Sequence, residues 1–273
     1  RFILNNYISN SLHNWSNLTN LNQARNEFEK LDARFENLKK IQNVFLNCYF
    51  DSSKTNTLFS EIALDQKTDF SRYNYFYASY VASKGQIDKA KNIVKSALKL
   101  YPRNLLLNQY KKDLTENKNV LVFDCKNKEH VVAEILYIAA NALSSQSMYL
   151  QSNFYLNLAK FLNEDFHSYN TLLAENFYKI DSYQNAKKIY KNLSKKGEAF
   201  QWYCSKQLAR IFIQQENKKE ALKLLKNSYN SLLKKEIYET FDYAEFLKNN
   251  EKFEESIPLY TIILNQIEKK HPL

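Results

Sequence analysis

Lys206 and Arg210 have the side-chain types and the spacing that best suit a chemical task. Residues four apart in a helix lie on one face, one turn from each other. An ammonium and a guanidinium so placed can hold a carboxylate, from a peptide side chain or a chain terminus. The alternative is an internal ion pair, in which Arg210 binds Glu175, 35 residues earlier, and stiffens the fold. Both interpretations stay open at the level of sequence.

Catalytic motifs are absent from the chain. It has two glycines in 273 residues and no Gly-rich phosphate loop, GxSxG or HExxH pattern. The histidines are scattered and form no ligand or catalytic spacing (His13, His130, His167 and His271). We therefore predict a protein that is not an enzyme, with no cofactor and no bound metal.

The three cysteines, Cys48, Cys125 and Cys204, are far apart and lack CxxC spacing. This pattern argues against a disulfide framework or a zinc site. The odd count favours a reducing, cytoplasmic compartment, whereas a periplasmic location would fit if Arg1 followed a removed signal. We expect Cys204 to be a core residue of a helix.

The formal charge of +10 concerns association rather than fold. Acidic peptides, nucleic acid and anionic membrane all remain open as partners. No apolar run reaches the roughly 18 residues of a transmembrane helix. Peripheral membrane contact stays compatible with the lysine content.

The segment 73–102 contains two helical patterns that a turn joins. Apolar residues recur at steps of three and four on both sides of Gly85, which indicates two amphipathic helices. Gly85 supplies the permissive turn, and Pro102 cannot continue the second helix. Ala78 and Ala90 are small enough to let the two helices approach closely.

This spacing resembles the tetratricopeptide repeat (TPR), a helix pair with a period of about 34 residues. With Ser71 as position 1, the small residues Ala78, Ala90 and Ala97 occupy positions 8, 20 and 27. Gly85 takes position 15 and Pro102 position 32. Asn74 stands at position 4, where the family usually has Trp.

The same pattern starts again at residues 133, 167, 202 and 237. Small residues stay in phase at positions 8 and 20 in each of these units, and the first also has one at 27 (Ala140, Ser152, Ala159, Ala174, Ala186, Ala209, Ala221, Ala244 and Ser256). One unit cannot bury its apolar stripe alone, but stacked units share a continuous core. We predict an all-α solenoid of antiparallel helix pairs, which the resemblance implies is a right-handed superhelix.

Three segments are expected along the chain. Residues 1–115 would form N-terminal helical repeats, degenerate except for a clear TPR at 71–104. Residues 116–132 would be a linker or irregular insertion within a partial unit. Residues 133–273 would form a block of about four repeats.

The resemblance also implies a peptide-binding groove lined by the first helix of each repeat. Aromatic rings interleaved with polar groups suit an extended peptide. The implied lining residues are Arg72, Tyr75, Ser79, Tyr137, Asn141, Thr171, Glu175, Tyr178, Lys206 and Arg210. Lysines at position 25 (Lys95, Lys191 and Lys226) would lie on the opposite side, either solvating it or contacting nucleic acid or lipid.

The first hypothesis for function is a non-enzymatic scaffold that takes a protein or acidic peptide in this groove. The second is RNA binding, because residues 169–193 also resemble a pentatricopeptide repeat and the 35-residue steps suit that family. Asp181 stands where that family commonly has a turn glycine. Nucleic acid is therefore the less favoured partner.

Overall fold

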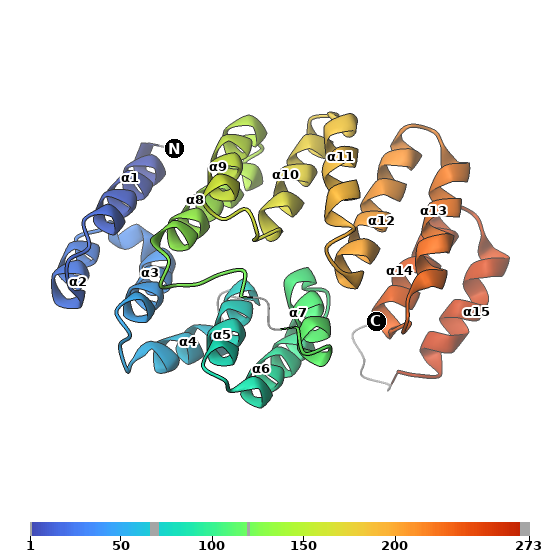
Figure 1. Ribbon diagram of the computed structural model, residues 1–273. Coiled ribbons are helices and arrows are strands. Elements are labelled where there is room, and N and C mark those ends of the chain that lie inside the picture. Colours follow the sequence, from blue (N-terminus) through green and yellow to red (C-terminus); the bar gives the residue numbers. More distant parts are fainter. Residues whose placement is uncertain (1, 66–70, 119–120, 268–273) are drawn as a thin grey trace. The chain divides into compact units, whose positions relative to one another are not determined.

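The computed structural model describes residues 2–65, 71–118 and 121–267, and this part of the chain is helical with no strand. Figure 1 shows that most successive helices are joined by short turns and that a longer stretch of chain leads into α8. The predicted all-α fold of antiparallel helix pairs is confirmed. The elements are α1 (Phe2–Ser16), α2 (Leu21–Glu29), a 3₁₀ turn η1 (Ala33–Phe35), α3 (Glu36–Tyr49), α4 (Thr55–Leu64), α5 (Ser71–Ser83), α6 (Ile87–Leu100), α7 (Leu105–Thr115), α8 (Lys128–Ser145), α9 (Tyr149–Leu162), α10 (Ser168–Lys179), α11 (Tyr183–Leu193), α12 (Glu198–Gln214), α13 (Lys218–Ser231), α14 (Ile237–Asn249) and α15 (Phe253–Leu264).

The chain divides into two compact units, Arg1–Ile180 and Asp181–Leu273. We call them unit 1 and unit 2. The division falls after α10, whereas the sequence suggested a division at 116–132. Residues 128–132 belong to α8, so the irregular segment is shorter than expected.

The turn inside each repeat has a left-handed residue at position 15. Gly85 has a φ of 80°, as the sequence predicted for this turn. The same position carries a positive φ in five further repeats (Asp51, Ser147, Asp181, Glu216 and Glu251). In the Gly85 turn the N–H of Gln86 donates to the carbonyl of Val81, which closes the end of α5 in a Schellman motif. The repeat register is therefore present in the backbone as well as in the small residues.

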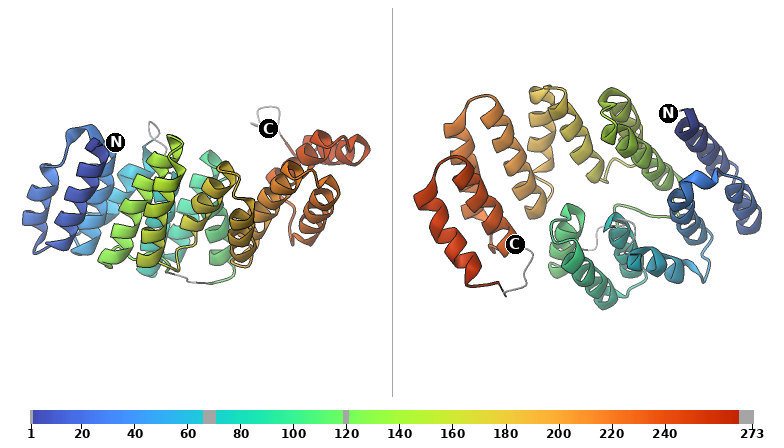
Figure 2. Two further views of the ribbon diagram at one scale, coloured as in Figure 1. Left: turned by 90° about the horizontal axis from the view of Figure 1, so that it is seen from above. Right: turned by 180° about the vertical axis from the view of Figure 1, so that it is seen from behind.

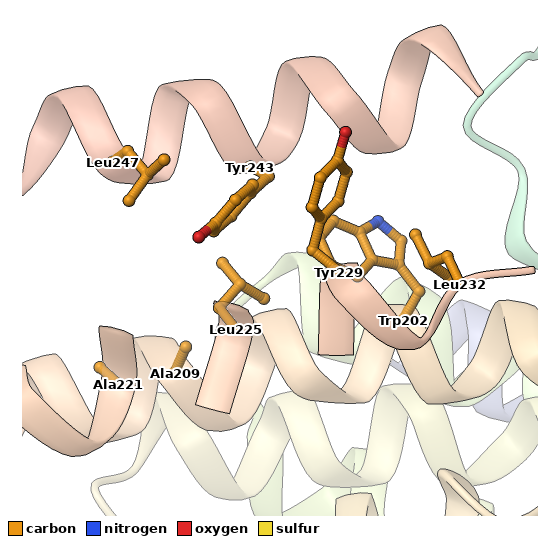
Figure 3. Packing of buried hydrophobic residues seen from close by; sticks show 8 residues of the cluster. All are labelled: Trp202, Ala209, Ala221, Leu225, Tyr229, Leu232, Tyr243 and Leu247. Carbon is orange, nitrogen blue, oxygen red and sulfur yellow. The ribbon is translucent and has the colours of Figure 1, made fainter. Parts of the chain in front are cut away.

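The small residues of the repeats lie in the helix–helix contacts. Those at positions 8 and 20 from residue 71 onward are all buried (Ala78, Ala90, Ala140, Ser152, Ala174, Ala186, Ala209, Ala221, Ala244 and Ser256). In unit 2, Ala209 of α12 and Ala221 of α13 belong to one core cluster with large side chains such as Tyr229 and Tyr243 (Figure 3). The predicted seam of small and apolar residues is confirmed.

Unit 1 contains a repeat with only its first helix. α7 ends like the first helices of other repeats, with Asn117 at a φ of 56° and the N–H of Lys118 bonded to the carbonyl of Asp113. Among the described residues, no further helix lies between α7 and α8. The chain instead runs through residues 121–127 to α8, crossing the interior of unit 1 (Figure 2).

Residues 121–127, which we call the crossing segment, place two side chains in the core, Phe123 and Cys125, while Leu121 and Lys126 stay exposed. Phe123 is buried, with its ring centroid 4.2 Å from that of Phe76 and 5.2 Å from that of Phe45. Two backbone groups of the segment are hydrogen-bonded to side chains of unit 1. The Asn163 side chain donates to the Val122 carbonyl, and the Asp124 N–H donates to Nδ1 of His130.

A disulfide between Cys48 and Cys125 anchors the crossing segment to α3, with 5.9 Å between the two Cα atoms. The expectation of no disulfide was wrong, because the fold brings together residues 77 positions apart. Disulfides persist in oxidising environments, so the argument for a reducing compartment no longer holds. Cys204 is free and buried, as predicted.

Ala209→Leu tests the seam. A larger side chain at this buried contact should force α12 and α13 apart and lower the free energy of unfolding by about 1–3 kcal/mol. Lys219→Leu places the same side chain on the exposed face of α13 and should change the free energy of unfolding by less than about 0.5 kcal/mol. Urea unfolding followed by circular dichroism measures both, and equal effects would contradict close helix contact at Ala209.

Thiol labelling tests the disulfide. The denatured, unreduced chain should expose one thiol, that of Cys204, and the reduced chain three. Reduction should also lower the stability of unit 1 by about 4 kcal/mol, the loop-entropy value for a closed loop of this length. Three thiols in the unreduced chain would show that Cys48 and Cys125 are not bonded.

Candidate partner-binding surface

The inner face of α5 is covered by the chain itself. Tyr75 and Ser79, predicted to line the groove, are both buried. The Tyr75 ring lies 5.0 Å from that of Tyr110 on α7 and stacks at 5.8 Å on Phe166. These two predicted contacts are therefore corrected: Tyr75 and Ser79 pack within unit 1 and offer no surface to a partner.

Arg72 makes a buried ion pair with Glu134 that joins α5 to α8. The Arg72 guanidinium donates from Nε to Oε1 at 2.6 Å and from Nη2 to Oε2 at 2.7 Å. Its Nη1 donates to the Ser168 hydroxyl of α10 at 2.6 Å. Aromatic rings enclose the guanidinium, with Cζ 3.9 Å from the Tyr137 centroid and 4.9 Å from that of Phe166. Because the Arg72 guanidinium is bound by several groups within unit 1, we infer that it stabilises the packing of α5 against α8 and α10.

Burial governs the ionisation of this cluster. It disfavours the charge on Arg72, but the adjacent Glu134 carboxylate offsets this and raises the pKa of Arg72 above its usual range. Burial raises the pKa of Glu134, and the Arg72 charge opposes that rise. Burial also raises the pKa of the Tyr73 and Tyr169 phenols well above normal, so both stay neutral. Glu134 is thus the anion that compensates Arg72.

The other predicted groove residues of unit 1 lie on α8 and α10. Asn141 is exposed on α8, whereas Tyr137 is partly covered beside Arg72. On α10, Thr171 donates to the Ser168 carbonyl, and Glu175 and Tyr178 are half-buried. Asn141 therefore remains accessible to a partner, and Glu175 and Tyr178 remain partly so.

Lys206 of α12 is already paired within unit 2. It donates to the Asp242 carboxylate of α14, and its ammonium lies 5.8 Å from the Trp202 ring centroid. Arg210, one turn along α12, is half-buried. The chain itself therefore supplies a carboxylate to Lys206, and binding of a partner's carboxylate at Lys206 and Arg210 stays a prediction.

Half-buried aromatic rings accompany these charges on the first helices of the unit 2 repeats. Tyr203 of α12 meets Tyr190 edge-on, with 6.1 Å between centroids. Phe241 of α14 meets Tyr260 of α15 edge-on at 6.2 Å. The Tyr260 hydroxyl donates to Glu245, which also accepts from Lys248. This face of unit 2, which we call the α12–α14 face, combines accessible ring area with a fixed charge pattern.

Sequence reasoning missed Glu134 and Asp242 as partners of Arg72 and Lys206. The signal for Glu134 was available, since Arg72 and Glu134 occupy the same position 2 of two repeats with opposite charge. Nothing in the sequence marked Asp242, because it lies 36 residues from Lys206 among many scattered charges.

Comparison with known proteins adds little to this geometry. No family model matches the chain, and no curated protein matches it. A solved structure, the TPR domain of P58(IPK), matches with 12% identity, covering 90% of this chain and 79% of that chain, at a TM-score of 0.26. A score this low does not support an inference, so the description of the fold as paired helical repeats rests on the register and helix pairs described above.

Two further searches of the described residues bear on function. They contain no group of three or more side chains placed to hold a metal ion. Among the same residues, no helix combines the length and hydrophobicity of a bilayer crossing.

Glu134→Leu tests the buried pair. It should lower the free energy of unfolding by about 3–5 kcal/mol, because it leaves the Arg72 guanidinium buried without its anion. The double variant Arg72→Met/Glu134→Leu should recover most of the loss, since neither charge remains. Lys226→Met, which breaks the exposed pair with Glu255, is the control and should cost less than about 1 kcal/mol. If the double variant were no more stable to unfolding than Glu134→Leu, this account would be contradicted.

Proposed function

We propose that this protein is a non-enzymatic helical-repeat scaffold that binds a protein segment on the α12–α14 face. The observation that carries the proposal is the set of half-buried rings, Tyr203 and Phe241, beside the Lys206–Asp242 pair. Rings supply contact area at low entropic cost, and fixed charges select the orientation of a bound segment.

Unit 2 is favoured over the inner face of α5 for a steric reason. Tyr75 and Ser79 are buried by other parts of unit 1, so a peptide could reach them only by displacing the core. Lys206 and Tyr203 are half-buried and keep accessible atoms. A partner carboxylate would share or replace Asp242 at Lys206, with Arg210 as a second cation one turn away. This chemistry suits an acidic segment or a chain terminus.

The test pairs two variants with equal charge change. Lys206→Gln/Arg210→Gln removes two cations from the proposed site, and Lys219→Gln/Lys223→Gln removes two from the exposed face of α13. Partners captured from the source cell should be lost at least tenfold by the first variant and retained by the second. Both variants should keep the wild-type helical content. Equal capture by all three proteins would overturn the assignment of this face.

The same proteins address the RNA alternative. Filter binding of single-stranded RNA at low and moderate salt should show no retention if the scaffold proposal is right. Retention that falls steeply with salt, and that the α13 variant weakens, would favour RNA binding instead.

A further inference from the structure

A cavity of about 190 Å³ lies beside the Cys48–Cys125 bond in unit 1. Both cysteines line it, and so do Ser83, Lys84 and Leu121, which are exposed at the surface. The cysteines themselves are only 2% and 6% exposed, so the cavity is the route by which a small molecule can reach them. An apolar cavity of roughly 150 Å³ holds benzene, so a small thiol fits beside the bond.

The bond ties an irregular piece of chain to the end of a helix. Cys48 is the second-last residue of α3, whereas the crossing segment lies outside any helix. Within the segment, the Asn127 N–H donates to the Asp124 carbonyl and the Lys126 N–H donates to the Asp124 carboxylate. These local bonds move with the turn, so separating the turn from α3 breaks no helical hydrogen bond. Stretches of this kind open locally at a lower free energy than helices in a core.

An ion pair links the same two segments beside the disulfide. Lys126 follows Cys125 directly, and its ammonium donates to the Asp51 carboxylate. Asp51 itself lies three residues after Cys48. Lys84 also approaches this carboxylate, with 3.6 Å between Nζ and Oδ1. All three side chains are about half exposed, so this link is weak and is screened by salt. Without the covalent bond, it is the link that would hold the Cys125 end of the segment to the end of α3.

We propose that the Cys48–Cys125 bond is a reversible redox latch, which low-molecular-weight thiols open through the cavity and whose opening frees the crossing segment without unfolding unit 1. The proposal rests on access to the bond, on the irregular segment that the bond ties down and on the weak ionic link beside it. The latch is separate from the α12–α14 face, so its test does not depend on the function proposed for that face.

The chemistry is ordinary thiol–disulfide exchange. A small thiolate attacks the sulfur of Cys125, the more exposed of the two, forms a mixed disulfide and displaces the thiolate of Cys48. A second thiolate attacks the added sulfur, releases the thiolate of Cys125 and leaves as the oxidised reagent. The two released thiolates take protons from solvent, and two electrons have passed from the reagent to the protein bond.

The route of reduction is the first test. In native buffer, 2-mercaptoethanol should reduce the bond of the full chain at a rate that is proportional to thiol concentration and unchanged by low, non-denaturing urea. Leu156→Ala, at a fully buried position of α9 that does not line the cavity, should leave this rate unchanged. If reduction required the unfolding of unit 1, this variant would speed it by about tenfold or more, because it lowers the stability of the unit. Thiol labelling after quenching measures the rate.

Hydrogen exchange measures what the latch controls. In the reduced chain, the amides of the crossing segment should exchange about tenfold faster or more, while those of α3 and α8 change little. Circular dichroism should show the wild-type helical content. Reoxidation with hydroxyethyl disulfide should restore slow exchange in the segment.

Asp51→Asn tests the ionic link. Asparagine tolerates the positive φ of 50° at this position, so the turn keeps its backbone. The crossing segment of the reduced variant should exchange about threefold faster than that of the reduced wild type. Glu36→Gln breaks the exposed pair with Lys40 near the other end of α3 and is the control, with exchange expected to match the wild type. In the oxidised chain both variants should match the wild type, because the covalent bond holds the segment.

Five results would overturn the latch. They are reduction that accelerates in low urea and in Leu156→Ala, exchange that rises throughout unit 1 on reduction, exchange of the crossing segment that does not change on reduction, a bond that does not re-form on reoxidation, and equal exchange of the segment in reduced Asp51→Asn and reduced Glu36→Gln. The first two would show that the bond opens only when unit 1 unfolds.

Discussion

Close approach of paired helices at small residues is the contact on which every repeat depends. Ala209 of α12 and Ala221 of α13 are fully buried in one cluster with large side chains such as Leu225 and Tyr229, and their small size lets the two helices pack closely. The left-handed residue at position 15 then reverses the chain within a few residues. With these two local features, one helix pair can stack on the next through contacts between neighbouring repeats alone.

Unit 1 adds a second kind of contact, between residues far apart in sequence. The Arg72–Glu134 pair, the Phe123 ring and the Cys48–Cys125 bond all join the N-terminal helices to α8 or to the segment leading into it. A linear solenoid has contacts only between neighbouring repeats. After α7 the chain continues through the crossing segment, whose Phe123 packs on Phe45 and Phe76, while Tyr110 of α7 and Phe166 cover Tyr75 of α5.

The burial of this face of α5 limits which surfaces of unit 1 a partner can reach. In unit 1, Tyr75 and Ser79 of α5 serve as core, Asn141 of α8 stays exposed, and α9 carries large apolar side chains that are exposed. In unit 2 the first helices keep half-buried rings and paired charges at the surface.

The sequence by itself determined the helix pairs, their register and the buried small residues, because these depend on local periodicity and on side-chain size within 35 residues. It also placed Gly85 in its turn, although the described residues include six non-glycine residues with the same left-handed backbone that the sequence did not indicate. Only the tertiary structure decided that Cys48 meets Cys125, that Glu134 neutralises Arg72 and that Tyr75 and Ser79 are covered. Each of these depends on packing between helices that are distant in sequence, and such packing leaves no periodic pattern in the chain.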